Sequence, residues 1–121
     1  MVSISFTVFK DKILDGSKRQ TIRPLRKRPF KVGDKLQLYW HQRQKDCELL
    51  REETCKETFL IAFKGNVVIR IKEPQLNTVL GFLEWVDLAK RDGFQGISEL
   101  MMWFQFQYPR LDSMTFQVVR W

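Results

Sequence analysis

The sequence predicts an α+β fold, a small mixed β-barrel with two or three short helices, in one domain over residues 1–121. Apolar and polar side chains alternate with a period of two near both ends of the chain, which is typical of half-buried strands. Helical patterns lie between these strands. Because strands at the two ends must pair across the inserted helices, a small barrel is favoured over a doubly wound sheet.

The first part of the chain begins with a strand over residues 2–8, where every second side chain is apolar. A short helix is expected over residues 9–15, and Gly16 provides its stop. Residues 18–28 lack apolar periodicity and contain Pro24. They predict a short extended piece that enters a basic loop.

The middle of the chain has a turn at residues 32–34 and then an alternating strand over residues 35–40. Residues 41–56 are polar and predict a long loop or a frayed hairpin. Residues 59–72 are rich in β-branched and aromatic side chains. Residues 65–66 either divide them into a hairpin or mark a bulge in one long strand.

The last part of the chain predicts a helix over residues 82–90, a turn over residues 92–94 and a second helix capped by Ser98 and stopped by Pro109. Residues 114–121 alternate again and predict a closing strand. The apolar stripe of the first helix is expected to consist of Phe82, Trp85, Val86 and Ala89.

Positive charge is concentrated in one segment. The chain has 21 Lys and Arg against 14 Asp and Glu, for a net charge of +7. The segment from Lys18 to Lys35 contains eight basic residues and one acidic residue, Asp34. In the rest of the chain, basic and acidic residues are equal in number. Such clustering is typical of a protein that contacts a phosphate backbone. The alternative is a solvated loop whose charge is incidental.

Several classes of protein are excluded by what the sequence lacks. No apolar run approaches the ~20 residues that span a bilayer, and the first residues do not resemble a signal peptide, so we expect a cytoplasmic protein. Cys47 and Cys55 are expected to be free thiols. With His41 they supply at most three Cys or His ligands, so no metal site is predicted. No Gly-rich phosphate loop or nucleotide fingerprint is present, and no cofactor is predicted.

Three segments carry a resemblance to a known family, and the resemblance covers the whole chain. The first has a helix-end glycine followed by K-x-x-T-x-R, the second a glycine–aspartate turn that opens a strand, and the third a helix end followed by a second helix start. They are residues 13–23, 31–36 and 88–100. In this order they resemble the ASCH family, a domain with a PUA-like β-barrel fold.

The resemblance implies an RNA-binding module, by analogy with PUA domains. One branch of the family is an amidohydrolase that deacetylates N4-acetylcytidine with a lysine, a threonine and a glutamate. The first two correspond to Lys18 and Thr21, and the third falls at or near Asp92, whose side chain is one methylene shorter. The resemblance therefore implies these three as catalytic residues.

The chemistry can be considered on its own. A lysine of lowered pKa could act as a general base on a threonine hydroxyl or on water, which would then attack an amide carbon. In an extended strand Lys18 and Thr21 would face opposite sides, so the chain must turn near them. Contact with Asp92 would raise the pKa of Lys18 and favour ligand binding over base catalysis. The alternative is a surface cation and an ordinary strand residue.

Other residues fit a nucleic-acid or nucleotide ligand. Arg23 could hold a phosphate or carboxylate, and Trp40, Tyr39 or Phe94 could stack on a base or belong to the core. Arg43 begins a stretch, residues 43–55, that resembles a variant in archaeal-type members of the family. The predicted cationic contacts are Arg19, Arg23, Arg26, Lys27, Arg28, Lys31 and Arg43.

The sequence therefore predicts a protein that binds RNA or a modified nucleoside in a cationic cleft. Lys18, Thr21, Arg23 and Asp92 would form this cleft, and the basic excess would form one contiguous face beside it. One alternative is an amidohydrolase acting on acylated cytidine-like compounds. Another is a ribonuclease, since a lysine and a carboxylate near a phosphate could support cleavage.

Overall fold

The computed structural model of the chain describes residues 1–65, 67–71 and 78–121. Within these ranges it contains two β-sheets, three α-helices and one turn of 3₁₀-helix. The predicted α+β class is therefore confirmed. No helix in the described ranges is long and apolar enough to cross a membrane.

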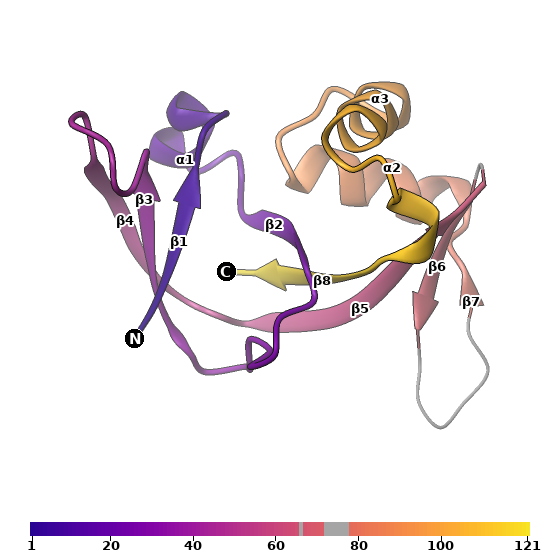
Figure 1. Cartoon of the computed structure of the whole chain (residues 1–121), viewed down its shortest axis with the longest axis horizontal. Helices are drawn as coiled ribbons and strands as arrows, with labels where there is room; N and C mark the ends of the chain where they lie inside the picture. Colours follow the sequence, from indigo (N-terminus) through magenta and orange to yellow (C-terminus); the bar gives the residue numbers. More distant parts are fainter. Residues whose placement is uncertain (66, 72–77) are drawn as a thin grey trace.

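The first sheet has three strands in the order β1-β3-β4. β1 (Val2–Phe6) runs parallel to β3 (Lys35–Trp40), and β3 pairs antiparallel with β4 (Glu48–Thr54). The parallel pair requires a crossover, and this crossover includes α1 (Lys10–Asp15). Figure 1 shows α1 at the upper end of this sheet.

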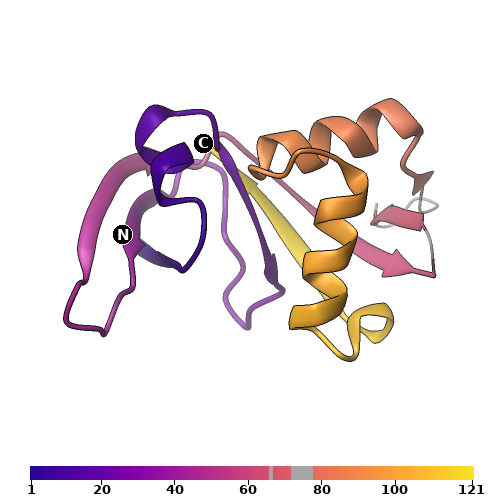
Figure 2. The ribbon, with the colours of Figure 1, turned by 90° about the horizontal axis from the view of Figure 1, so that it is seen from above.

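The second sheet has five antiparallel strands in the order β2-β8-β5-β6-β7. They are β2 (Gln20–Pro24), β8 (Thr115–Arg120), β5 (Glu57–Lys64), β6 (Val67–Ile71) and β7 (Thr78–Val79). Two helices, α2 (Phe82–Arg91) and α3 (Ile97–Gln107), lie together above this sheet in Figure 1, and Figure 2 shows them crossing at an angle. A 3₁₀ turn, η1 (Leu111–Ser113), leads into β8.

A closed barrel is not seen among the described strands. Each sheet keeps two edge strands, β1 and β4 in the first and β2 and β7 in the second. The sheets are connected instead by the chain itself, because only Cys55 and Lys56 separate β4 from β5. In Figure 1 these two strands form one long curved ribbon that passes from the first sheet into the second.

Two clusters of buried apolar side chains stabilise this arrangement. The sheet-two cluster lies between the second sheet, α2 and α3, and the sheet-one cluster lies between the first sheet and α1. β8 contributes to both, because its two faces are buried against different neighbours. Phe116 and Val118 belong to the sheet-two cluster, whereas Val119 and the following Trp121 belong to the sheet-one cluster.

The structure decides two open alternatives in favour of hairpins. The charged residues 48–54 form β4, so the long-loop interpretation of residues 41–56 was wrong. β4 is an edge strand that buries only Leu50. It is held in the sheet by pairing with β3, which its charged composition does not reveal. β5 and β6 pair with each other across a turn that includes Gly65, with φ +58°. Residues 66 and 72 of this predicted region lie outside the described residues.

Two details of the helices differ from the prediction. α3 begins after Gly96, so Ser98 lies in its first turn and does not cap it. Phe82, expected on the buried stripe of α2, is 71% exposed, whereas Leu88 and Ala89 are buried. The reason is that the first turn of α2 lies away from the core, against which the helix packs from Trp85 onward.

Candidate functional site

Three main-chain hydrogen bonds fix the segment that carries Lys18. The N–H of Lys18 donates to the carbonyl of Lys12 in α1 at 3.0 Å, and the N–H of Arg19 donates to the carbonyl of Arg91 at 3.2 Å. The carbonyl of Arg19 accepts the N–H of Trp121 at 3.1 Å. The segment thus lies between the ends of α1 and α2, and the Lys18 side chain reaches the residue that follows α2.

The turn after α2 depends on a glycine. Gly93 has φ +103°, a region that residues with a Cβ rarely adopt. A Cβ at this position would also lie 3.1 Å from the ring of Phe9. Phe9 itself has φ +66°, which is rare for a bulky side chain and is found most often at functional sites. Phe9 and Gly93 thus pack closely together next to Asp92.

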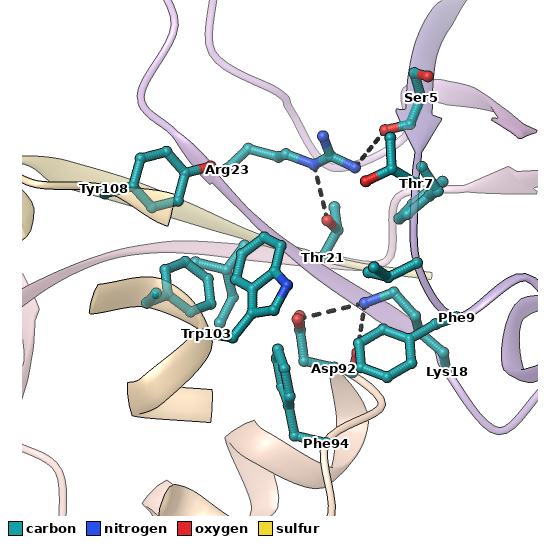
Figure 3. Close-up of a pocket in the computed structure, with 14 residues that line it drawn as sticks. Ser5, Thr7, Phe9, Lys18, Thr21, Arg23, Asp92, Phe94, Trp103 and Tyr108 are labelled. Carbon is teal, nitrogen blue, oxygen red and sulfur yellow. Dashed lines mark hydrogen bonds and ion pairs between the residues drawn. The ribbon is translucent and has the colours of Figure 1, made fainter. Parts of the chain in front are cut away.

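Lys18 and Asp92 form a buried ion pair (Figure 3). Lys18 Nζ donates to the main-chain carbonyl of Asp92 at 2.5 Å and lies 3.3 Å from its Oδ2. The two side chains are only 3% and 7% exposed. Lys12 Nζ donates to the next carbonyl, that of Gly93. Both ammonium groups therefore sit at the C-terminal end of α2, where the helix dipole favours positive charge.

Burial opposes the charged forms of this pair. It lowers the pKa of Lys18, and the nearby carboxylate of Asp92 counteracts that change. Burial likewise raises the pKa of Asp92, against the charge of Lys18 and a hydrogen bond from Gln20. The two pKa values thus move toward each other. The rings of Phe6 and Phe9, with centroids 5.6 and 5.4 Å from Lys18 Nζ, favour the charged amine.

Arg23 forms the opposite side of the site. Its Nε donates to Thr21 Oγ1 at 2.9 Å, and its Nη2 donates to the carbonyl of Ser5 at 2.7 Å. Thr21 is buried and uses its oxygen as an acceptor, so its hydroxyl hydrogen remains free to donate elsewhere. Burial lowers the pKa of Arg23.

These side chains line one cavity of about 110 Å³. Its polar lining includes Lys18, Thr21, Arg23 and Asp92, which are labelled in Figure 3. Its aromatic lining consists of Phe6, Phe9, Phe94, Trp103, Phe104 and Tyr108. An apolar cavity of about 150 Å³ can hold one benzene molecule. At about 110 Å³ this cavity is smaller, so it has room for at most one small ring, with hydrogen-bonding groups within reach.

The structure brings together four of the predicted site residues, namely Lys18, Thr21, Arg23 and Asp92, and adds Phe94. Lys18 precedes β2, so the alternation of the strand does not place it opposite Thr21. Within the described parts of the chain, no hydrogen bond joins Lys18 to Thr21. Their catalytic and binding roles stay predictions.

The basic loop lies apart from this cavity. Arg26, Arg28 and Lys31 border a separate depression beside the start of β1, and Lys27 is exposed in the same loop. In Figure 1 the loop between β2 and β3 lies below the central strands, whereas the three helices lie above them. The basic excess is thus divided between residues that line the cavity and residues of the loop that do not.

The other predicted contacts also lie outside the cavity. Arg19 Nε donates to the carbonyl of Gly16 at 3.1 Å. Trp40 packs against the sheet-one cluster and stacks on His41, with ring centroids 4.1 Å apart. Arg43 lies in the turn between β3 and β4 with φ +76°. A ligand that touched these residues would have to extend beyond the cavity.

Sequence reasoning missed several residues of the site, among them Ser5, Trp103 and Gln20. Ser5 and Trp103 line the cavity, and Gln20 contacts Asp92 from behind it. An uncharged amide within a run of cations was the available signal for Gln20. Cys47 and Cys55 are both free thiols. Across the described ranges, no group of three or more His, Cys, Asp or Glu residues is arranged to hold a metal ion.

No family model, curated protein or solved structure matches this chain. We therefore base the functional proposal on the cavity and on the residues that line it.

Proposed function

We propose that the cavity binds a single nucleobase, as part of RNA or of a modified nucleoside, in a protein of the ASCH type. The observation that carries this proposal is a cavity with room for at most one small ring, lined by both aromatic and hydrogen-bonding side chains. The K-x-x-T-x-R motif supports it, because its lysine, threonine and arginine all line the cavity. The described sheets do not close into a barrel. The PUA-like barrel of that family is therefore part of this proposal and not of the described fold.

The polar groups match the edge of a nucleobase. Lys18 and Arg23 are donors and suit ring nitrogens and carbonyl oxygens, whereas the carboxylate of Asp92 accepts an exocyclic amine. Trp103 and Phe94 offer faces on which an unstacked base can pack, as is usual for bases of single-stranded RNA. One base, rather than a run of bases, fits the volume.

The basic loop suits the backbone of a longer ligand. Arg26, Lys27 and Arg28 are exposed and follow β2, the strand that carries Thr21 and Arg23. Exposed cations of this kind contact phosphates, which fixes the position of a nucleic acid without reading its sequence. An RNA would therefore use the loop for affinity and the cavity for one base.

Amide hydrolysis is the second candidate, favoured by a buried lysine of lowered pKa in the same cavity as a threonine hydroxyl. Uncharged Lys18 would take a proton from Thr21 or from water, and the freed oxygen would bond to the amide carbon. The carbon–nitrogen bond would then break, and the proton would pass to the departing amine. Where Thr21 had attacked, water would then hydrolyse its ester, which releases acetate and restores the hydroxyl. The ion pair with Asp92 opposes this step, because a charged lysine is a poor base.

The test is a titration of isotopically labelled protein with cytidine, N4-acetylcytidine and a short RNA. We expect each ligand to shift the indole N–H signal of Trp103, assigned with Trp103→Phe. Mass spectrometry of the mixtures distinguishes the candidates. Binding leaves N4-acetylcytidine intact, hydrolysis converts it into cytidine and acetate, and shortened RNA would indicate a ribonuclease.

Lys18→Ala tests the same cavity, with Lys27→Ala as the exposed control. The cavity variant should weaken nucleoside binding strongly and abolish any hydrolysis, yet weaken RNA binding only modestly, as one contact among several. The control should leave nucleoside binding intact. Unshifted Trp103 at millimolar nucleoside would contradict the proposal.

A further inference from the structure

A chain of hydrogen bonds leads from the ion pair to the far side of β2. Gln20 is fully buried, and its Nε2 donates to Asp92 Oδ1 at 3.1 Å and to the carbonyl of Leu88 at 3.0 Å. Its Oε1 accepts from Arg120 Nε at 2.8 Å. Asp92 therefore presents one oxygen to Gln20 and the other to Lys18.

The orientation of the Gln20 amide is determined by its neighbours. Its nitrogen faces two acceptors, a carboxylate and a carbonyl, and its oxygen faces a guanidinium, which can only donate. A rotated amide would oppose oxygen to both acceptors and N–H groups to the guanidinium. Only one orientation of this amide satisfies all of its hydrogen-bonding groups. The amide is therefore fixed, and it holds Oδ1 of Asp92 in place.

Arg120 is itself held from two other elements. It lies directly opposite Gln20 in the pairing of β2 with β8. Its Nη1 donates to Glu57 Oε1 in β5 at 2.9 Å, and its Nη2 lies 3.9 Å from Asp87 Oδ2 in α2. The support for Gln20 thus comes from three elements that do not line the polar side of the cavity.

We propose that Gln20 is the positioning residue of this site, holding Asp92 so that Oδ2 faces Lys18 and setting how the pair shares its proton. The other titratable groups that face the pair are Lys12 from α1, Arg23 from β2 and Tyr108 after α3. The inference deepens the proposed function, on which the importance of the pair rests. Its test needs no ligand, so the two can fail separately.

Gln20→Glu keeps the shape of the side chain and replaces the amide donor by a carboxylate oxygen beside Asp92. Two carboxyl groups that share a site retain a proton, so we expect the titration of the Asp92 carboxyl to move to higher pH. Carbon-13 NMR of Asp and Lys side chains in the ligand-free protein measures this shift. Asp92→Asn and Lys18→Arg assign the signals.

Gln117→Glu is the matched control. Gln117 is also buried and donates its Nε2 to the carbonyl of Phe30 and to Thr58 Oγ1, both at 2.8 Å. It makes no contact with Asp92 among the bonds of the described residues, so any general effect of a buried carboxylate would appear in both variants. A shift of Asp92 confined to the Gln20 variant supports the inference.

Arg120→Lys decides the question if Gln20→Glu does not fold. It keeps the charge but removes the Nε donor that fixes the amide, so we expect a smaller shift in the same direction. An unchanged Asp92 titration in the folded variants, or equal shifts in the Gln20 and Gln117 variants, would overturn the inference. If the Asp92 titration moves as expected in the Gln20 variant but the unaltered protein binds no nucleoside, only the proposed function is overturned.

Discussion

The ammonium group of Lys18 lies 3.3 Å from Oδ2 of Asp92, with both side chains almost entirely removed from water. Breaking such a pair from one side leaves an uncompensated buried charge. We expect Lys18→Met to lower the free energy of unfolding by about 3–5 kcal/mol. Lys18→Met combined with Asp92→Asn should recover part of that loss, as measured by denaturant unfolding.

A surface pair provides the comparison. Lys10 Nζ lies 2.9 Å from Glu48 Oε1, but these side chains are 36% and 49% exposed. Because water screens the pair, Lys10→Met should lower the free energy of unfolding by at most about 1 kcal/mol. Equal losses for Lys10→Met and Lys18→Met would argue against a desolvated pair.

The same pair should give the stability a pH dependence of known sign. The pKa of Asp92 in the folded state is raised above its ordinary value of 3.8. Between pH 3.8 and the raised pKa, the folded state therefore holds more protons than the unfolded state. The free energy of unfolding therefore falls as pH rises through that window. The pKa of Lys18 in the folded state is lowered from 10.5, so between the lowered pKa and pH 10.5 the unfolded state holds more protons. The free energy of unfolding therefore rises with pH in this second window.

Subtracting the curve of the Lys18→Met, Asp92→Asn double variant from that of the unaltered protein isolates both effects. The difference should decline on the acid side and recover on the alkaline side. A difference that increases with pH on the acid side would mean that the attraction of Lys18 outweighs burial and lowers the pKa of Asp92.

Gly93 and Gly33 separate backbone strain from crowding. Both have positive φ, +103° and +95°, but only at Gly93 would an added Cβ have a neighbour, the Phe9 ring, within 4 Å. Gly33→Ala should lower the free energy of unfolding by about 1–2 kcal/mol from the left-handed backbone alone. Gly93→Ala should cost more and also shift the Trp103 indole signal. Similar losses and an unmoved indole would contradict the close packing.

Binding of single-stranded RNA should weaken steeply with salt. Each phosphate contact contributes about −0.7 to the slope of log affinity against log salt. Replacing Arg26, Lys27 and Arg28 together by Gln should therefore flatten the slope by about 2. Lys45, Lys56 and Lys90, exposed elsewhere, form the control set. An unchanged slope in the loop variant would locate RNA binding on another surface.

The sequence predicted the elements that carry their own signal. Alternation identified β1, β3 and β8, and Gly16 marked the end of α1 with φ +84°. β4 was uncertain because its stability comes from pairing with β3, which its charged composition does not reveal. The two-sheet arrangement was missed, because composition and periodicity do not specify whether the outer strands meet.

The site shows the same division. Lys18, Thr21 and Asp92 were placed together by a resemblance between motifs, since 71 positions separate Thr21 from Asp92. Gln20 was overlooked because its partners Asp92 and Arg120 lie 72 and 100 positions away in the sequence. Contacts of such long range depend on the register of β2 against β8, which no local pattern specifies.

The double role of β8 has a consequence for how the protein is made. Its two faces complete different clusters, and it pairs with β2 and β5 as well. During translation, neither cluster can close before β8 leaves the ribosome. A nascent chain paused earlier would expose the apolar faces of both sheets, a state prone to aggregation and to capture by chaperones.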